Sequence, residues 1–328
     1  MKIFRIAALS CLLVLSITSC KKDPEEQWKV EIKNPVEKIE IIDISKEFYN
    51  ANIPLEQFKA KFPWFQGTVS DEDFAKRRID PEEIKIYKEA VSKVDQKKIG
   101  QELQDLFSHI KHYFPEFKTP KVYFFSSALQ MVQDPIIYDP QTNFLFVDIT
   151  GFMGTNNPNY KGLELYFQKS MNPENIVPKI SKVFIENIVP YTGESQKFID
   201  LLVYNGKMML LQDAFLPNTP DYLKMDYDKK QYEWTDANQA NIYNYFVENN
   251  LIFGDDHRLV NRFITQGPFS KFYTEIDNES SPMVGVFIGW QICKEYYKKH
   301  PDTKLVEFLK MNATDIFNEA GYKPKLEE

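Results

Sequence analysis

Glu186 is the side chain best placed for acid–base chemistry, in the stretch VFIENIVPY at residues 183–191. In a helical zinc site, two histidines one turn apart bind the metal and a glutamate between them activates water. Here no histidine is near the glutamate, since the four histidines of the chain are His109, His112, His257 and His300. A glutamate on its own is most often a solvated residue on the outer face of a helix. The stretch therefore raises the question of whether a catalytic helix has lost its metal ligands.

Two histidines and one cysteine are the other side chains that could bind a metal or react. His109 and His112 lie three residues apart on one predicted helix face. Such a pair without a third ligand is more often a surface or core feature than a metal site. Cys293, in IGWQICKEYY, has no histidine in its helix to activate it, so we predict that it is a buried apolar residue.

The N-terminus has the pattern of a lipoprotein signal peptide. Two positive charges in MKIFR precede a short apolar run, AALSCLLVLSI, and the small residues of ITSC end at Cys20. The apolar run is too short to span a bilayer stably. We predict that residues 1–19 are removed and that the Cys20 thiol carries diacylglycerol, with palmitate-type chains that hold the protein at a membrane surface. Cys11 leaves with the signal peptide, so no intramolecular disulfide is expected.

The composition is that of a globular, acidic protein. Of 328 residues, 43% are hydrophobic and 15% are aromatic, well above the profile of a disordered chain. Glycine is scarce, at 12 residues, and no Gly-rich phosphate loop or nucleophile elbow occurs. Removing residues 1–19 takes away Lys2 and Arg5, which leaves 38 basic against 47 acidic residues, a net charge of −9. We therefore expect no nucleic-acid partner.

The domain organisation follows from shifts in pattern along the chain. Residues 20–35 are charged and contain two prolines, which predicts a lipidated tether. Residues 36–328 are predicted to form a single globular domain. Its sheet-containing part is residues 36–170 and its helical part is residues 171–328.

The expected strands and helix starts lie mostly in the sheet-containing part. VEKIEIIDIS and KVYFFSS have strand patterns, and PIIYDPQTNFLFVDI predicts a hairpin across Asp139–Asn143. Between them the pattern is helical, with Asn52, Ser70 and Asp80 as N-cap candidates.

Two helices should position the stretch around Glu186. One extends from about Pro173 to Val189, and SQKFIDLLVYNGKMMLLQDAF forms the next. The predicted fold is therefore α+β and helix-rich: a small N-terminal mixed sheet with helices, followed by a mostly helical C-terminal half.

Several segments spread over the chain resemble the gliding-motility lipoprotein GldB family of Bacteroidota. They are NPENIVPKI, YNGKMMLLQDAFLPNTPD, YEWTDANQANIYNYFVENNLIF, PFSKFYTEIDNESSP, IGWQICKEYY and GYKPK. None of them is the signature of a known reaction. The ordered set, however, is specific to this family.

That family in turn resembles predicted zinc peptidases of the gluzincin kind, with HExxH on one helix and Glu-Gly at the start of the next. The resemblance puts the histidine positions on Ile185 and Val189, the general base on Glu186 and the third ligand on Asn205, before Gly206. Alkyl side chains have no lone pair to donate, and an amide oxygen is a poor zinc ligand. The resemblance thus implies a pseudopeptidase without metal, cofactor or catalytic residue, in which Glu186, Asn205 and Gly206 belong to a remnant cleft.

The resemblance also implies the process and the partners. It predicts a non-catalytic component of the gliding motility and type IX secretion apparatus, held in the outer membrane by Cys20 and facing the periplasm. Its expected partners are other gliding proteins, such as the small companion GldC. An extended peptide could lie in the cleft by strand addition near FLFVDI, with the loop at residues 151–162 as a mobile rim.

Two other functions stay open from the sequence. A membrane-anchored glycan-binding protein would need coplanar exposed rings. The candidates for such a platform are Tyr232, Trp234, Tyr243, Tyr245 and Phe246. An active zinc metallopeptidase would need ligands that the positions around Glu186 lack.

Overall fold

The computed structural model describes residues 26–193, 197–275 and 277–325. The strands are β1 (Ile41–Asp43), β2 (Lys121–Phe125), β3 (Ile136–Asp139) and β4 (Phe144–Asp148). The first helices are α1 (Ile44–Phe48), α2 (Leu55–Lys61), α3 (Asp71–Ile79), α4 (Pro81–Lys93), α5 (Gln96–Tyr113) and α6 (Leu165–Gln168). The later helices are α7 (Ile176–Ile188), α8 (Phe198–Phe215), α9 (Asp221–Lys224), α10 (Lys229–Ala237), α11 (Gln239–Glu248), α12 (Arg258–Phe263), α13 (Val284–Lys299), α14 (Leu305–Lys310) and α15 (Ala313–Ala320). The predicted α+β, helix-rich fold class is confirmed.

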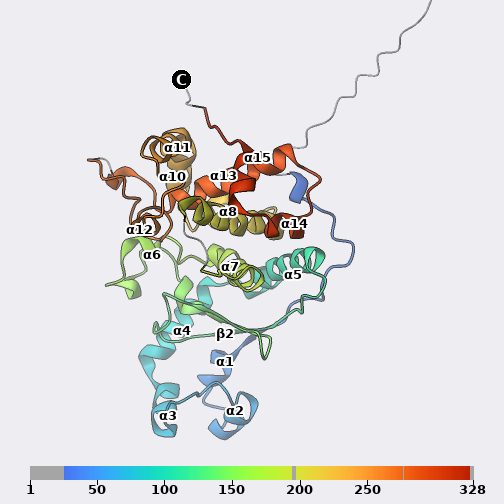
Figure 1. Ribbon diagram of the computed structural model, residues 1–328. Helices are drawn as coiled ribbons and strands as arrows, with labels where there is room; N and C mark the ends of the chain where they lie inside the picture. The colour runs from blue at the N-terminus through green and yellow to red at the C-terminus, as the bar shows by residue number, and fades with distance from the viewer. Residues whose placement is uncertain (1–25, 194–196, 276, 326–328) are drawn as a thin grey trace, which may run out of the picture.

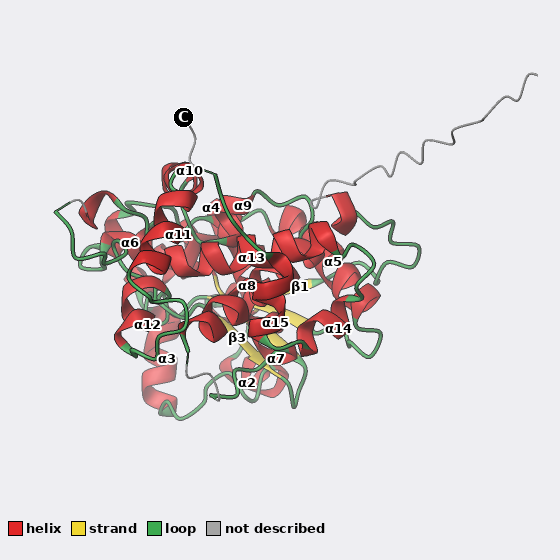
Figure 2. Cartoon of the chain, turned by 45° about the horizontal axis from the view of Figure 1, so that its top comes forward, coloured by secondary structure: helices red, strands yellow, loops and turns green. Residues whose placement is uncertain are grey.

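These elements are stacked in layers. In Figure 1, α1, α2 and α3 lie below the sheet, α5 and α7 lie above it, and α8, α13 and α15 lie above those. Figure 2 shows the strands enclosed by helices and loops. Because α7 and α8 pack against each other, the segments around Glu186 and Asn205 face one another across two layers.

The sheet has the order β1-β2-β4-β3. β1, β2 and β4 are parallel, and β3 pairs antiparallel with β4. The predicted hairpin across Asp139–Asn143 is therefore confirmed. The expectation of strand addition near FLFVDI is wrong, because β4 is paired on both sides and the edge beside it is occupied by β3.

Side chains alternate between the two faces of the sheet, as the strand geometry requires. Val122, Leu145 and Val147 point into the main core with α5, α7 and α8. Tyr123 and Phe125 point into a smaller core with Phe58 and Phe74 of α2 and α3. Two separate apolar layers thus hold the sheet in place.

Two of the three predicted N-caps are confirmed. Ser70 Oγ accepts a hydrogen bond from the backbone N–H of Asp73 at 3.1 Å, and Asp80 accepts from two N–H groups at the start of α4. Asn52 does not cap a helix, because α2 begins two residues later than expected and its N-cap is Pro54.

Glycines allow α8 and α13 to pack with their backbones in contact. A Cβ atom on Gly206 would lie 2.2 Å from the carbonyl oxygen of Gly289, and one on Gly289 would lie 1.8 Å from that of Leu202. Distances this short are impossible for real side chains. The close approach explains Gly206 through packing alone.

The segment predicted as a tether is packed at one residue. Trp28 is buried, and its ring lies 6.2 Å from that of Tyr113 and 5.2 Å from that of Tyr297. Within the described ranges, no helix has both the length and the apolar character to cross a membrane. The predicted lipidation site, Cys20, lies outside the described residues.

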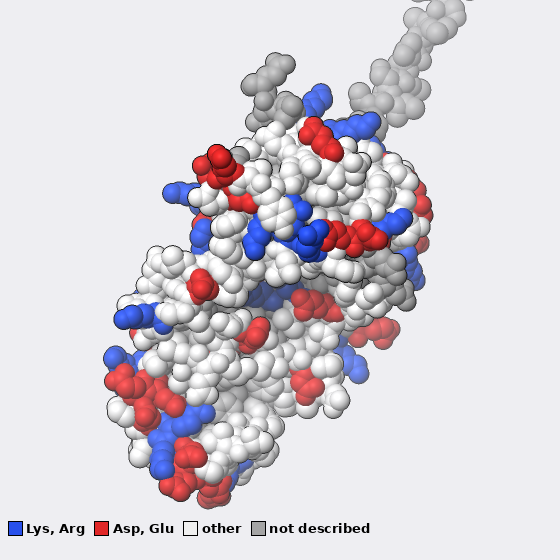
Figure 3. Space-filling view, turned by 60° about the vertical axis from the view of Figure 1, so that its left-hand side comes forward, with Lys and Arg blue, Asp and Glu red and all other residues white. Residues whose placement is uncertain are grey.

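The surface carries mixed charge. On the face shown in Figure 3, basic and acidic side chains lie in scattered groups that contain both signs, separated by wide areas of other residues. Interspersed charges of this kind are typical of a solvated protein surface.

Candidate functional site

α7 positions the stretch that contains Glu186. Ile176, Ile180 and Phe184 recur at helical spacing and are buried against the core, which fixes the orientation of the helix. Ile185 is also fully buried, at 0% exposure, whereas Glu186 is exposed. α7 ends at Ile188 because Pro190 disfavours helical backbone in the residue before it, Val189.

α7, α8 and the start of α13 enclose a pocket of about 480 Å³, which we name the α7–α8 pocket. It is lined by Lys182, Ile185, Glu186, Pro190, Tyr191, Tyr204, Asn205, Met208, Met209, Gln212, Ile264, Met283 and Val286. Three of the positions singled out in the sequence, Ile185, Glu186 and Asn205, therefore meet in one cavity.

Two of the singled-out residues do not line this pocket. Val189 follows the last residue of α7 with non-helical backbone, and its carbonyl accepts a hydrogen bond from the Tyr204 hydroxyl at 2.9 Å. Gly206 is buried in the contact between α8 and α13. Both positions thus have structural contacts that account for them.

The residues at the implied metal positions do not fit a zinc ion. Ile185 and Val189 present only carbon atoms, and the Asn205 amide nitrogen donates to the carbonyl of Leu201 at 2.8 Å. None of the four histidines lines the α7–α8 pocket. In the described part of the chain, no group of three or more His, Cys, Asp or Glu side chains is arranged to hold a metal ion.

The carboxyl groups of Asp226 and Glu186 differ in how closely lysine side chains approach them. Lys182 donates to Asp226, which also lies 3.6 Å from the ammonium of Lys179. Burial opposes ionisation of Asp226, but these two lysines outweigh it and lower the pKa of its carboxyl. Glu186 has no Lys or Arg within 4.0 Å among the residues the structure describes. Partial desolvation raises the pKa of Glu186, and the charge of Lys182 only partly opposes this.

Two tyrosine rings border the pocket. Tyr191 and Tyr204 meet edge to face, with ring centroids 5.1 Å apart. Tyr191 is 50% exposed, so it lies at the opening. Desolvation, followed by the nearby charges of Glu186 and Tyr191, raises the pKa of Tyr204. The Tyr204 hydroxyl therefore stays protonated as a hydrogen-bond donor at neutral pH.

Gln212 is a pocket residue that the sequence did not reveal. It is only 1% exposed, and its amide nitrogen donates to the Lys224 carbonyl at 3.0 Å. Its Oε1 atom is buried without a hydrogen-bond partner in the described structure. An unpaired buried acceptor is unfavourable, so a ligand donor at this atom would stabilise the protein. In the sequence the residue stands in the apolar run LLQDAF, where nothing marks it as part of a cavity.

The loop at residues 151–162 is not a rim of the α7–α8 pocket. Asn157 and Asn159 donate to the Glu89 carboxylate at 2.7 and 2.9 Å, and Tyr160 is buried beneath them. Asn156 lines a different pocket, of about 430 Å³. The loop is therefore attached to α4, and the expected role as a rim is wrong.

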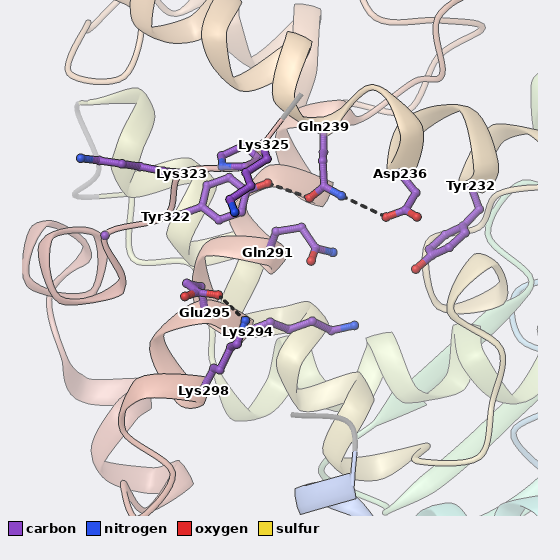
Figure 4. A pocket seen from close by; sticks show the side chains of 12 residues that line it. Tyr232, Asp236, Gln239, Gln291, Lys294, Glu295, Lys298, Tyr322, Lys323 and Lys325 are labelled. Atoms are coloured by element: carbon purple, nitrogen blue, oxygen red, sulfur yellow. Dashed lines mark hydrogen bonds and ion pairs between the residues drawn. The ribbon is translucent and has the colours of Figure 1, made fainter. Parts of the chain in front are cut away.

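A larger pocket, of about 620 Å³, lies between α10, α13 and the segment after α15 (Figure 4). Some of its polar groups bond to one another. Tyr322 donates to Gln239 at 3.0 Å, Gln239 donates to Asp236 at 3.3 Å, and Lys298 lies 3.5 Å from Glu295.

The five aromatic residues proposed as a sugar platform do not form one coplanar surface. Phe246 is fully buried, and the Tyr245 ring meets it at 69°. Tyr243 packs edge to face against Tyr322, with ring planes at 85°.

Segments that carry the family resemblance meet at a buried charge cluster. Lys224 lies 2.8 Å from Asp213 and 2.9 Å from Asp221, and the Trp290 indole donates to Asp213 at 2.7 Å. Lys294 lies 3.2 Å from Asp221. Burial disfavours the charged form of Lys224, but the two carboxylates outweigh it and raise its pKa. The cluster connects α8, α9 and α13 behind the α7–α8 pocket. Cys293 beside it is buried, as predicted.

Comparison with known proteins identifies the family. No curated protein and no solved structure matches the chain. A family model described as "Gliding motility protein GldB" matches residues 25–324, which is nearly the whole chain. The protein therefore belongs to the GldB family of gliding motility proteins.

Proposed function

We propose that this protein is a non-catalytic, lipid-anchored component of the gliding machinery, and that it binds a partner protein in the α7–α8 pocket. The family supplies the process, gliding motility. The observation that supports the site is the meeting of Ile185, Glu186 and Asn205 in one open cavity. A peptidase frame that has lost its ligands would keep such a cleft as a binding surface.

The lining of the pocket supports binding rather than hydrolysis. A zinc hydrolase needs lone pairs at three protein positions, whereas here two of those positions carry alkyl groups. Elemental mass spectrometry of the purified protein should therefore find no stoichiometric zinc. One equivalent of zinc, or peptidase activity that Glu186→Gln abolishes, would overturn the non-catalytic assignment.

A photocrosslinking experiment tests the binding site. p-Benzoylphenylalanine in place of Tyr191, at the opening of the pocket, should capture a component of the gliding machinery in living cells. The matched control is Phe253, an aromatic residue of similar exposure, 52%, that does not line the pocket. Equal capture at both positions, or no capture at position 191, would show that the α7–α8 pocket is not the binding site.

GldC and other gliding proteins are the partners we propose to look for first, and mass spectrometry of the captured species identifies them. The face of the membrane is a separate part of the proposal. If the body lies in the periplasm, protease added to intact cells should leave the protein uncut, whereas cleavage would place it on the cell surface.

A further inference from the structure

The polar groups that line the α7–α8 pocket are mostly hydrogen-bond acceptors. With respect to the described residues, Glu186 contributes a carboxylate without a bonding partner, Gln212 a buried Oε1 without a partner, and Asn205 an amide oxygen whose nitrogen donates to its own helix. Two of the donors are engaged elsewhere, since Lys182 bonds to Asp226 and the Tyr204 hydroxyl bonds to a backbone carbonyl, which leaves the exposed Tyr191 hydroxyl as a donor at the opening. A complementary ligand must therefore be rich in N–H groups and positively charged.

The rest of the lining is apolar and adaptable. Met208 and Met209 of α8 and Met283 before α13 contribute flexible thioether side chains. Such side chains reshape around the aliphatic part of a ligand. The rings of Tyr191 and Tyr204 border the pocket, and a delocalised cation is attracted to the face of such a ring. The pocket thus combines an apolar wall with a negatively charged group near its opening.

We propose that the α7–α8 pocket recognises an arginine side chain of the partner protein. This inference rests on the proposed function, because it names the chemistry of the partner at the same site. The planar guanidinium has five N–H donors, so it can bond both oxygens of Glu186 and still donate to an amide oxygen. Its three methylene groups pack against the methionines, and its flat face stacks on tyrosine. A lysine ammonium matches this lining less well, because it is compact and strongly hydrated.

A pair of short peptides tests the inference. N-acetyl-Ala-Arg-Ala-amide is the probe, and the same peptide with citrulline in place of arginine is its uncharged control of equal shape. Binding is followed by NMR on protein with ¹³C-labelled methionine methyl groups. At millimolar concentration the arginine peptide should shift the signals of Met208, Met209 and Met283 saturably. The citrulline peptide should bind about tenfold more weakly, as expected for the loss of a charge-assisted pair.

Two glutamate variants test whether Glu186 is the group that distinguishes the arginine peptide from the citrulline peptide. Glu186→Gln should weaken arginine-peptide binding about tenfold and make the two peptides bind alike. Glu248→Gln, a matched change of an exposed glutamate at the end of α11, should leave both affinities unchanged. An unchanged methionine spectrum of the free variants shows that each of them is folded.

The possible failures are distinguishable from those of the proposed function. Equal binding of the two peptides to the wild type, or no methionine shift with either, would overturn the arginine assignment. Capture at position 191 would in that case still support the pocket as a partner site. If capture occurs, the arginine assignment also requires that the crosslinked partner segment contain an arginine whose replacement by glutamine abolishes capture.

Discussion

Ile185 and Glu186 are neighbours with opposite environments. The first is fully enclosed in the core, and the second lines the α7–α8 pocket with no Lys or Arg nitrogen within 4.0 Å among the described residues. A carboxylate in that position is a cost to the folded state, because partial desolvation disfavours its charge. Residues that reduce stability in a cavity are frequently the ones that bind a ligand.

At this scale the sequence could predict part of the site. The hypothesis of a peptidase-like helix pair groups Ile185, Glu186 and Asn205, and all three line one pocket. It could not indicate Gln212, since one amide in an apolar helix has no pattern that reveals which way it points. It was also misleading for Gly206, which is required by the contact with α13.

The first prediction concerns Glu186→Gln. The folded-state pKa of Glu186 is raised, so the native state binds more protons than the unfolded state across the acid range, and this contribution to stability falls as the pH rises. The neutral variant should therefore unfold with equal or higher free energy than the wild type at pH 7. The difference should disappear as the pH falls below the ordinary carboxyl pKa.

Urea denaturation over a series of pH values measures this difference. Glu248→Gln, on the exposed end of α11, serves as the control and should be neutral throughout. A clear loss of stability in Glu186→Gln at pH 7 would mean that the carboxylate has a structural partner.

At the scale of helices and strands, some elements can be predicted from the local sequence alone. Ser70 and Asp80 start α3 and α4 because their side chains accept N–H groups that a helix start leaves unpaired. The hairpin of β3 and β4 is equally local. The position of β4 inside the sheet cannot be predicted from local sequence. It depends on parallel pairing with β2, and β3 lies between these two strands along the chain. The predicted helical C-terminal half likewise does not include the break at Asn238, between α10 and α11.

The second prediction belongs to the contact between α8 and α13. Gly289→Ala places a methyl group against the backbone of Leu202, and neither helix can move without disturbing the pocket and the buried charge cluster. We expect a loss of about 3 kcal/mol in the free energy of unfolding, as for overpacking of a core. Denaturant unfolding followed by circular dichroism gives the value.

Gly267→Ala is the control for this change. At that position a Cβ atom would meet only one carbonyl oxygen, at 3.9 Å. Its effect should be less than about 1 kcal/mol. Equal stability of the two variants would show that the helices can separate at no cost.

The whole molecule is a layered body whose family places it in gliding motility. Its proposed attachment to a membrane depends on Cys20, ahead of the first described residue. The third prediction is that Cys20→Ala gives a folded protein that no longer sediments with membranes, since the change removes the predicted lipid attachment.

Fractionation of cells measures this outcome, and circular dichroism of the purified variant checks the fold. Sedimentation equal to that of the wild type, in cells that lack the crosslinked partner, would show that lipid is not the anchor.

The burial of Trp28 sets a limit on the working distance of such an anchored body. Trp28 is the eighth residue after Cys20, and a fully extended chain over those eight steps spans at most about 28 Å. Trp28 contacts Tyr297 near one end of α13, and Val286 lines the pocket near the other end, about 16 Å away along the helix axis. If Cys20 is lipidated, the proposed binding site therefore operates only within a thin zone above the bilayer. To be bound, a partner must itself be membrane-attached or come within that zone.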